Sequence, residues 1–358
     1  MKILLVSPLP PPEGGIATWT ERLLANWPQD FELIHYNSAT GLSKKYPGIM
    51  ARIVRGMKKG PVDLLHINSL AKKNRIDICH VATSGHLSFF RDVLIAILMR
   101  MLGKKSVFHM RFGRLPQVCR SRNWESLLLS MLFRNCNGMI AIDQASFTAL
   151  RDKFGREKVY LLPNFIDLKQ FPAETDLDKQ RMPGRIFFSG HVHEEKGIRE
   201  LFEACNEIPQ AKLVLAGKCT DAFKSKLLGM YPAVNYEFLG IVPKEEIIRQ
   251  LQLCEIFAFP SYSEGFPNSV AEAMGCGCAI AATPVGAIPE MLNADSAADA
   301  CGILVAEKDS VSLRKALLRM LSDRNLCREM GRRARKRVES EYSATIVLDK
   351  LGSIWKSL

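Results

Sequence analysis

The sequence has no run of apolar residues long enough to cross a membrane. The longest candidate, Val93–Met99, holds seven apolar residues between charged neighbours, whereas a spanning helix needs about 20. The start of the chain also lacks the pattern of a secretory signal, because prolines from Pro8 to Pro12 interrupt the short apolar stretch Lys2–Ser7. These absences predict a cytoplasmic protein unless something else anchors it.

The ten cysteines include no Cys-x-x-Cys pair. Zinc and redox sites are commonly built from such pairs, and disulfide frameworks belong to oxidising compartments. We therefore expect free thiols in the core. The spacing Asp176–Asp178 can hold a metal in other proteins, but here it lies in a polar, proline-containing stretch and is interpreted as solvated charge. No metal and no cofactor are expected.

Negative charge is scarce in the first half of the chain. Residues 1–167 hold 24 Lys and Arg against 12 Asp and Glu, so this half carries the whole net charge of +12. Nucleic acid, an anionic membrane face or an acidic ligand are the partners that such an excess favours. The composition, with 47% hydrophobic residues, is that of a packed protein and excludes disorder of the whole chain.

Short β-branched runs alternate with amphipathic helical patterns, which predicts an α/β protein with parallel sheets. Strands are expected at Lys2–Ser7, Val62–Ile67, Ile76–Ala82, Lys105–Met110, Gly138–Ile142, Val159–Leu162, Arg185–Ser189, Ala211–Ala216, Val234–Phe238, Ile256–Pro260, Cys278–Ala282 and Gly302–Val305. Helices are expected at Gly14–Trp27, Phe89–Leu102, Trp124–Arg134, Ile198–Asn206, Lys244–Gln252, Ser269–Met274, Val311–Leu321 and then on to about Glu341.

The alternation stops once, in the polar segment 169–184, which we interpret as an interdomain linker. The predicted domains are residues 1–168 and 185–341. A last amphipathic helix in 342–358 is able to cross back to the first domain. Doubly wound sheets bind ligands outside the carboxyl ends of their strands.

Two strand–helix turns have the residues of an anion site. The segment Pro11–Ile16 contains Gly14 and Gly15, and paired glycines at a helix start allow close approach of a phosphate or sugar. A plain glycine turn is the alternative. The segment Ser189–Gly197 follows a strand and carries His191 and Lys196, and that lysine can reach a diphosphate as a point charge. A solvated loop is the alternative there.

The most informative motif runs from Glu264 to Glu272. Glu264 lies on a loop that continues as Gly-Phe-Pro-Asn, Ser269 opens a helix, and Glu272 lies about one turn inside it. Backbone N–H groups at the helix start suit a diphosphate, and carboxylates on either side suit sugar hydroxyls. A loop acid and a helix-surface acid without a ligand are the alternative.

This motif resembles the E-x7-E signature of glycosyltransferase family 4, retaining enzymes of the GT-B fold. Leu162–Asp167 is similar to the family's PNGiD segment, with Phe165 where glycine is usual. Ser189–Gly197 is similar to its GR…KG phosphate loop, and Thr283–Glu290 to its TpvGgipE turn. The resemblance covers nearly the whole chain and implies two Rossmann-like domains that face each other across a cleft.

The resemblance implies a role for each matching residue. Glu272 matches the glutamate that holds the ribose hydroxyls, Glu264 the one that contacts the donor sugar and is needed for transfer, and Lys196 the lysine on the diphosphate. The other donor-binding positions are Gly14, Gly15, Gly190, His191, Val242, Phe266, Pro267, Asn268, Ser269 and Val270. The family has an arginine where His191 stands. Because a histidine is only partly charged near neutral pH, this departure bears on the strength and pH dependence of diphosphate binding.

His109 matches the family's histidine at the end of a strand in the first domain, facing the donor sugar. His80 and His86 are interpreted as turn residues that compete for a role in binding the acceptor, and Arg111 is a further candidate. For each histidine, a satisfied turn residue without a ligand is the alternative.

The implied reaction moves a sugar from a nucleotide-diphosphate sugar to a saccharide or lipid-linked acceptor, with retention at the anomeric carbon and without a metal. Arg111, Arg114, Arg120 and Arg122 precede the apolar helix that starts at Trp124, and Leu115 lies among them. They favour peripheral attachment to the anionic inner face of the membrane. Two core helices with ordinary basic ends are the alternative.

Two other functions compete with this one. A sugar-nucleotide epimerase or a phosphorylase can have the same fold, but the acid–base groups or pyridoxal lysine they need are not evident. A non-enzymatic nucleic-acid binder would use the basic half. It lacks a recognition motif and would leave both glutamates without a role, so we expect no nucleic acid.

Overall fold

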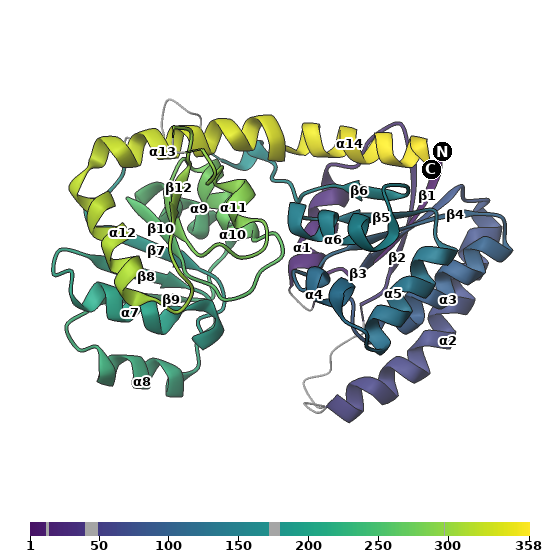
Figure 1. Cartoon of the computed structure of the whole chain (residues 1–358), viewed down its shortest axis with the longest axis horizontal. Helices are drawn as coiled ribbons and strands as arrows, with labels where there is room; N and C mark the ends of the chain where they lie inside the picture. Colours follow the sequence, from purple (N-terminus) through teal and green to yellow (C-terminus); the bar gives the residue numbers. More distant parts are fainter. Residues whose placement is uncertain (12–13, 40–48, 172–179, 297) are drawn as a thin grey trace. The chain divides into compact units, whose positions relative to one another are not determined.

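The computed structural model describes residues 1–11, 14–39, 49–171, 180–296 and 298–358. The chain divides into two compact units: unit 1 comprises Met1–Asn164 and Thr345–Leu358, and unit 2 comprises Phe165–Ala344. Each unit has one parallel six-stranded sheet with helices against it (Figure 1). The pair Asp176–Asp178 lies outside the described residues.

The sheet of unit 1 has the order β2-β1-β3-β4-β5-β6. Its strands are β1 (Lys2–Ser7), β2 (Glu32–Asn37), β3 (Ile78–Thr83), β4 (Lys105–Met110), β5 (Gly138–Ala141) and β6 (Val159–Leu161). β1, β3, β4 and β5 are buried almost throughout, as expected for parallel strands covered on both faces. The order reverses between β1 and β3, which makes their carboxyl ends a natural ligand site.

Two helical layers cover this sheet. The helices are α1 (Gly15–Ala25), α2 (Ile49–Asn74), α3 (Ser88–Met101), α4 (Leu115–Arg120), α5 (Trp124–Asn135), α6 (Gln144–Phe154) and α14 (Ala344–Ser357). Because strand side chains alternate between faces, Val6 and Phe108 join the core cluster formed with α2, α3 and α5. His80 and His109 point the other way, toward Trp19 of α1 and Trp355 of α14.

The expected strand at Val62–Ile67 is wrong, because these residues lie within α2. The buried side chains Asp63, Ile67 and Ala71 recur every four residues, which is the period of a helix face. The run was misleading because its few apolar residues, taken without their neighbours, also fit a short buried strand. β2, α4 and α6 of this unit were not predicted, and neither were the helices Asp221–Met230 and Ile288–Met291 of unit 2.

The sheet of unit 2 has the order β12-β11-β10-β7-β8-β9. Its strands are β7 (Arg185–Ser189), β8 (Lys212–Ala216), β9 (Asn235–Gly240), β10 (Ile256–Phe259), β11 (Ala279–Ala282) and β12 (Gly302–Leu304). Its α-helices are α7 (Ile198–Asn206), α8 (Asp221–Met230), α9 (Lys244–Leu253), α10 (Asn268–Gly275), α11 (Ile288–Met291), α12 (Ser310–Ser322) and α13 (Arg324–Arg337). All strands pair in parallel, and the order reverses between β7 and β10.

The two ends of unit 2 lie side by side. The Ile166 N–H donates to the Tyr342 carbonyl, and the Ala344 N–H donates to the Ile166 carbonyl, both at 3.0 Å. After this point the chain returns to unit 1 as α14. In the described part of the chain, no helix has both the length and the apolar character to cross a membrane. The ten cysteines are free thiols and all but Cys219 are buried, which confirms the expectation for them.

The last helix is anchored in unit 1 by Trp355. Its indole N–H donates to Nδ1 of His80 at 3.1 Å, and its ring contacts Phe31 and Trp27 at centroid distances of 5.0 and 5.3 Å. Trp355 and His80 are both fully buried. Burial, together with the Arg111 cation, lowers the pKa of His80 to about 3, so this imidazole is neutral in the folded protein.

Acid should destabilise unit 1 through His80. The unfolded imidazole binds a proton below about pH 6.5 and the folded one only near pH 3, so the free energy of unfolding falls as the pH drops through 6.5. From pH 7 to pH 5 the loss from this one group is about 2 kcal/mol. All four tryptophans lie in unit 1, so urea unfolding followed by tryptophan fluorescence measures this unit.

The matched variant is His80→Gln, whose side-chain oxygen can still accept from Trp355 but does not titrate. Its unfolding free energy should depend less on pH than that of the wild type over the same range. An unchanged pH dependence would contradict the assignment to His80.

Candidate nucleotide-sugar site

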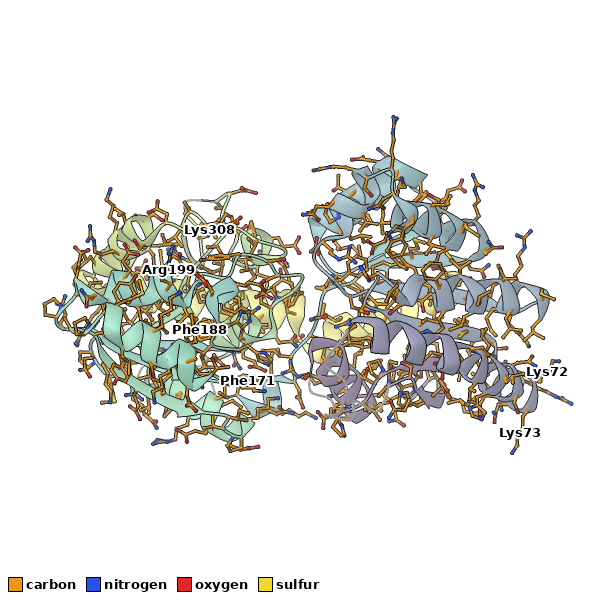
Figure 2. The ribbon with its side chains drawn as sticks, turned by 90° about the horizontal axis from the view of Figure 1, so that it is seen from below. Lys72, Lys73, Phe171, Phe188, Arg199 and Lys308 are labelled. Carbon is orange, nitrogen blue, oxygen red and sulfur yellow. The ribbon has the colours of Figure 1, made fainter. Side chains whose placement is uncertain are left out.

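The candidate residues of unit 2 gather at the carboxyl edge of its sheet, where the strand order reverses. β7 and β10 are neighbours, with Ile186 opposite Ile256. Phe188, labelled in Figure 2, stacks on Phe259 of β10 at a centroid distance of 5.8 Å. The loops that follow these two strands therefore emerge together, at the place where doubly wound sheets bind ligands.

Gly197 locks the two loops against each other. Its φ is +67°, and a Cβ there would lie 2.0 Å from the Pro260 carbonyl oxygen, so a larger residue does not fit. The Tyr262 N–H donates to the Glu195 carbonyl at 3.0 Å across the same contact. This close approach fixes the position of the residue before Gly197, which is Lys196.

Lys196 and Glu264 form an ion pair between the two loops. The Ser261 hydroxyl donates to the same carboxylate oxygen, Oε1 of Glu264, at 2.7 Å. The Lys196 and Glu264 side chains are 22% and 14% exposed, so both are largely withdrawn from water yet open to a ligand. A cation is thereby held beside a carboxylate at the edge of the sheet.

Glu264 is also fixed from the side of β11. Gly286 has a φ of +57°, and a Cβ there would lie 2.2 Å from the Gly265 carbonyl oxygen. The Ala287 N–H donates to that same carbonyl at 2.7 Å, and the Thr283 hydroxyl donates to the Ser261 carbonyl. The loop that carries Glu264 is therefore held by the turns after both neighbouring strands.

The start of α10 follows directly. Pro267 is the residue before the helix, and in the described structure no side chain caps this end. The first N–H groups of an α-helix have no partner within the helix and attract anions. Phe266 and Val270 are buried and fix the helix, whereas Asn268 and Ser269 are half-exposed. Glu272, also half-exposed, lies in the second turn.

The remaining loops of this edge are tied through glycines. A Cβ on Gly217, after β8, would lie 1.8 Å from the Gly190 carbonyl oxygen, and the Gly217 N–H donates to the Gly240 carbonyl at 2.7 Å. Val242, two residues beyond β9, is half-exposed, and His191 is exposed. These positions share the edge with Lys196, although no described contact joins them to it.

Ser261 and Thr283 were not singled out from the sequence. Ser261 follows Pro260 at the end of a buried strand, and Thr283 follows β11 in the same way. In the sequence, both residues could have been noticed as hydroxyls at the carboxyl ends of parallel strands. The sequence does not reveal that both hydroxyls hydrogen-bond to the loop that carries Glu264.

In unit 1, three candidates lie at the carboxyl edge of the sheet. Gly14 and Gly15 open α1, and a Cβ on either would meet nothing within 4 Å, so packing does not require glycine there. His86 lies on the loop before α3 and is exposed. Its backbone N–H donates to Glu125 at 2.7 Å and its ring contacts Trp124 edge-on at 5.4 Å.

The expected turn position of His80 is wrong, since it lies in the interior of β3 with 0% exposure. His109 is the penultimate residue of β4 and is also fully buried. Arg111 is buried as well: its guanidinium lies 4.1 Å from the Trp19 ring centre and donates to Asn164 at 2.5 Å. Arg111 and His80 therefore lie within the packing of unit 1, beneath its surface.

His109 is neutral in this environment. Burial and the neighbouring Arg111 cation lower its pKa well below 6.5. Nη1 of Arg111 lies 3.3 Å from Nε2 of His109, which orients that nitrogen as an acceptor. In unit 2, burial and Lys196 lower the pKa of His193. Among the described residues, no group of three or more His, Cys, Asp or Glu side chains could hold a metal ion.

Two six-stranded doubly wound units, with a cation, a carboxylate and a helix start at the switch point of the second, make up the GT-B fold. Residues 173–337 match the family described as Glycosyl transferases group 1. This segment is therefore a group 1 glycosyltransferase domain, which confirms the family resemblance seen in the sequence.

Similar proteins agree with this assignment. The chain is 26% identical over 237 residues to a GDP-mannose-dependent phosphatidylinositol monomannoside mannosyltransferase of Corynebacterium glutamicum, covering 60% of this chain and 61% of that protein. Matches to the first curated relatives span 36% to 61% of the length of those proteins. The fold resembles sucrose-phosphate synthase of Thermosynechococcus elongatus, with a TM-score of 0.80, 17% identity and coverage of 100% and 98%. HepE of Anabaena in complex with UDP gives 0.77, with 17% identity and full coverage of both chains.

Gly197 and Gly229 offer a matched test of the loop contact. Gly197→Ala should lower the free energy of unfolding of unit 2 by about 2 kcal/mol or more, because Cβ strikes the Pro260 carbonyl. Gly229 lies in α8 with nothing within 4 Å of a Cβ, so Gly229→Ala should raise it by about 0.5–1 kcal/mol. Calorimetric unfolding measures both, and equal effects would contradict the proposed close approach.

Proposed function

We propose that the chain transfers a sugar from a nucleotide-diphosphate sugar to a hydroxyl of a lipid-linked saccharide acceptor. The observation that carries this proposal is the Lys196–Glu264 pair beside the start of α10. It is supported by the family match of residues 173–337. It is further supported by the name of the Corynebacterium relative, which combines a GDP-sugar donor with a phosphatidylinositol acceptor, and by the neighbour in complex with UDP.

The donor is proposed to bind unit 2. Its diphosphate lies against the start of α10, where backbone N–H groups and the ammonium of Lys196 neutralise it. An ammonium has three donors, so Lys196 can keep Glu264 while it binds a phosphate oxygen. Glu264 then accepts from hydroxyls of the donor sugar, Glu272 accepts from the ribose hydroxyls, and the base lies near Val242.

The remaining donor-binding positions complete this pocket. Gly190 and the backbone of Phe266, Pro267, Asn268, Ser269 and Val270 are proposed to line it. Gly14 and Gly15 of unit 1 are proposed as further donor-binding positions. Packing does not require glycine at positions 14 and 15. We propose that glycine is present there because a ligand approaches the backbone closely. His191, which is exposed, is proposed to add a contact to the diphosphate.

The chemistry is proposed to be electrostatic. Breaking the bond between the sugar carbon and the phosphate oxygen puts positive charge on the sugar and negative charge on the leaving diphosphate. Donors that are already in place stabilise the diphosphate without reorganisation. The acceptor hydroxyl forms the new bond on the same face and gives its proton to the departing phosphate, so the configuration is retained. No metal takes part.

Unit 1 is proposed to receive the acceptor. His109 is neutral and fully buried, so we propose that it supports the backbone near the donor sugar from beneath the surface. His86 is exposed at the carboxyl edge of the sheet and is the better candidate for the acceptor. His80 and Arg111 are buried, so we propose that they hold this edge in place. We further propose a cytoplasmic protein on the inner membrane face that does not bind nucleic acid.

Nucleoside diphosphates should raise the melting temperature of the protein, with UDP and GDP as the first probes. Lys196→Ala should remove most of this shift because the diphosphate loses its cation, at a cost of about 1.5–3 kcal/mol of binding. Glu272→Ala should weaken binding of the nucleoside diphosphate but not that of inorganic diphosphate, because it removes the contact to the ribose.

Lys226→Ala provides the control, since this lysine of α8 in the same unit is exposed. It should leave the thermal shift unchanged. An undiminished shift in the Lys196→Ala variant would contradict the proposed site.

The transfer reaction should proceed in EDTA and give a product with the donor's anomeric configuration. The reason is that Lys196 and backbone N–H groups, rather than a metal, neutralise the leaving diphosphate. NMR of the product formed from the donor that gives the largest thermal shift distinguishes the anomers. An inverted product, or loss of transfer with EDTA, would contradict this mechanism.

A further inference from the structure

The outer faces of α3 and α5 are apolar. On α3 and the residue before it, the exposed side chains are Leu87 (38%), Phe90 (53%), Leu94 (49%) and Met101 (80%). On α5 they are Trp124 (43%), Leu127 (62%) and Met131 (38%). We call these seven residues the outer apolar face. Their spacing of three, four or seven residues places each set on one side of its helix.

The same two helices have a separate apolar side that faces the sheet. Phe89, Val93 and Met99 of α3 and Leu129 and Leu132 of α5 are buried in the core of unit 1. A helix on the surface of a globular protein normally has polar residues on the side opposite the core. The outer apolar face is therefore in excess of what the fold of unit 1 needs.

The two helices run side by side in the same direction, so their outer residues form one surface (Figure 1). At their amino ends, the rings of Phe90 and Trp124 stack at 5.7 Å with an angle of 13° between planes. At their carboxyl ends, Arg100 donates to Asn135 at 3.3 Å. A contiguous apolar surface of this kind on a soluble unit marks an interaction site.

Acidic side chains are kept off this surface. Between residues 78 and 142 the chain has only two acids, Asp92 and Glu125, and both are buried. Asp92 pairs with Arg91 at 2.8 Å. Glu125 accepts two hydrogen bonds from Arg114, at 2.5 and 2.7 Å. Each acid is thus neutralised inside the unit.

Exposed cations belong to the same helices and to the segments next to them. They are Arg100, Lys105, Arg120, Arg122 and Arg134. Lys72 and Lys73, labelled in Figure 2, are also exposed at the end of α2, which packs on α3. Two residues expected to take part do not: Arg111 and Leu115 are buried.

We infer that the outer apolar face of α3 and α5 inserts into the headgroup region of an anionic lipid bilayer. Apolar side chains, with Trp124 among them, enter the acyl boundary, and the surrounding cations bind lipid phosphates. A second copy of the chain is a poorer occupant, because pairing through this face brings the cations of both copies together. The inference deepens the proposed membrane location and rests on it, but not on the transfer reaction.

Vesicle binding tests the inference directly. Wild-type protein should co-sediment with phosphatidylglycerol vesicles at low salt, bind phosphatidylcholine vesicles less, and be released by salt. Brominated lipid should quench mainly Trp124, which is 43% exposed, because Trp19 and Trp355 are buried and Trp27 is only half-exposed. The double variant Leu94→Ser/Leu127→Ser should bind at least about tenfold more weakly, and it keeps Trp124 as the reporter.

The matched control is Ile241→Ser/Val311→Ser, which changes two exposed apolar residues of unit 2 and should bind vesicles like the wild type. Failure of the wild type to bind, or an equal loss in the control, would overturn the inference. So would a loss of self-association, measured by sedimentation velocity, in the Leu94/Leu127 variant. A thermal shift with UDP or GDP in the same variant reports the donor site separately, so failure there counts against the proposed function instead.

Discussion

The approach of Gly197 to the Pro260 carbonyl is the constraint on which the candidate site depends. It sets the distance between the loops after β7 and β10, and the Lys196–Glu264 pair exists only at that distance. Gly286 repeats the arrangement on the other side, against the Gly265 carbonyl. In both places the absence of a side chain brings two backbones together. These backbone contacts hold the loops in place, so the side chains of Lys196 and Glu264 are not needed for that purpose.

Unit 1 uses its positive charge in two distinct ways. Arg111 is buried against Trp19 and Asn164. Burial, together with this guanidinium, lowers the pKa of its neighbour His109 and keeps that imidazole neutral. Arg91 and Arg114 neutralise the two acids of the α3–α5 region. Arg100, Lys105, Arg120, Arg122 and Arg134 are exposed. The net charge of this half is thus the sum of a structural part and a surface part. Only the surface part is available to an anionic partner.

The sequence predicted most strands of both sheets, because buried parallel strands are short continuous apolar runs bounded by turns. β7, α7 and α10 fell within a residue of their observed limits, since glycine and proline mark their ends. The strand predicted at Val62–Ile67 is wrong because a short apolar run does not show whether its period is that of a strand or of a helix. β2 was missed because it is only half-buried. The contact of Lys196 with Glu264 joins residues 68 positions apart. Spacing along the chain carries no information about such a contact, nor about the burial of His80 and Arg111.

The return of the last helix to unit 1 has a consequence for synthesis. Trp355 bonds to His80 across 275 positions of sequence, and all of unit 2 lies between them. On the ribosome, unit 2 emerges complete before α14 exists, whereas unit 1 must wait with His80 and the aromatic rings around it uncovered. Domains that fold as units during translation generally do so from the amino terminus. Here the order of completion is reversed, and the first half of the chain is the last to be finished.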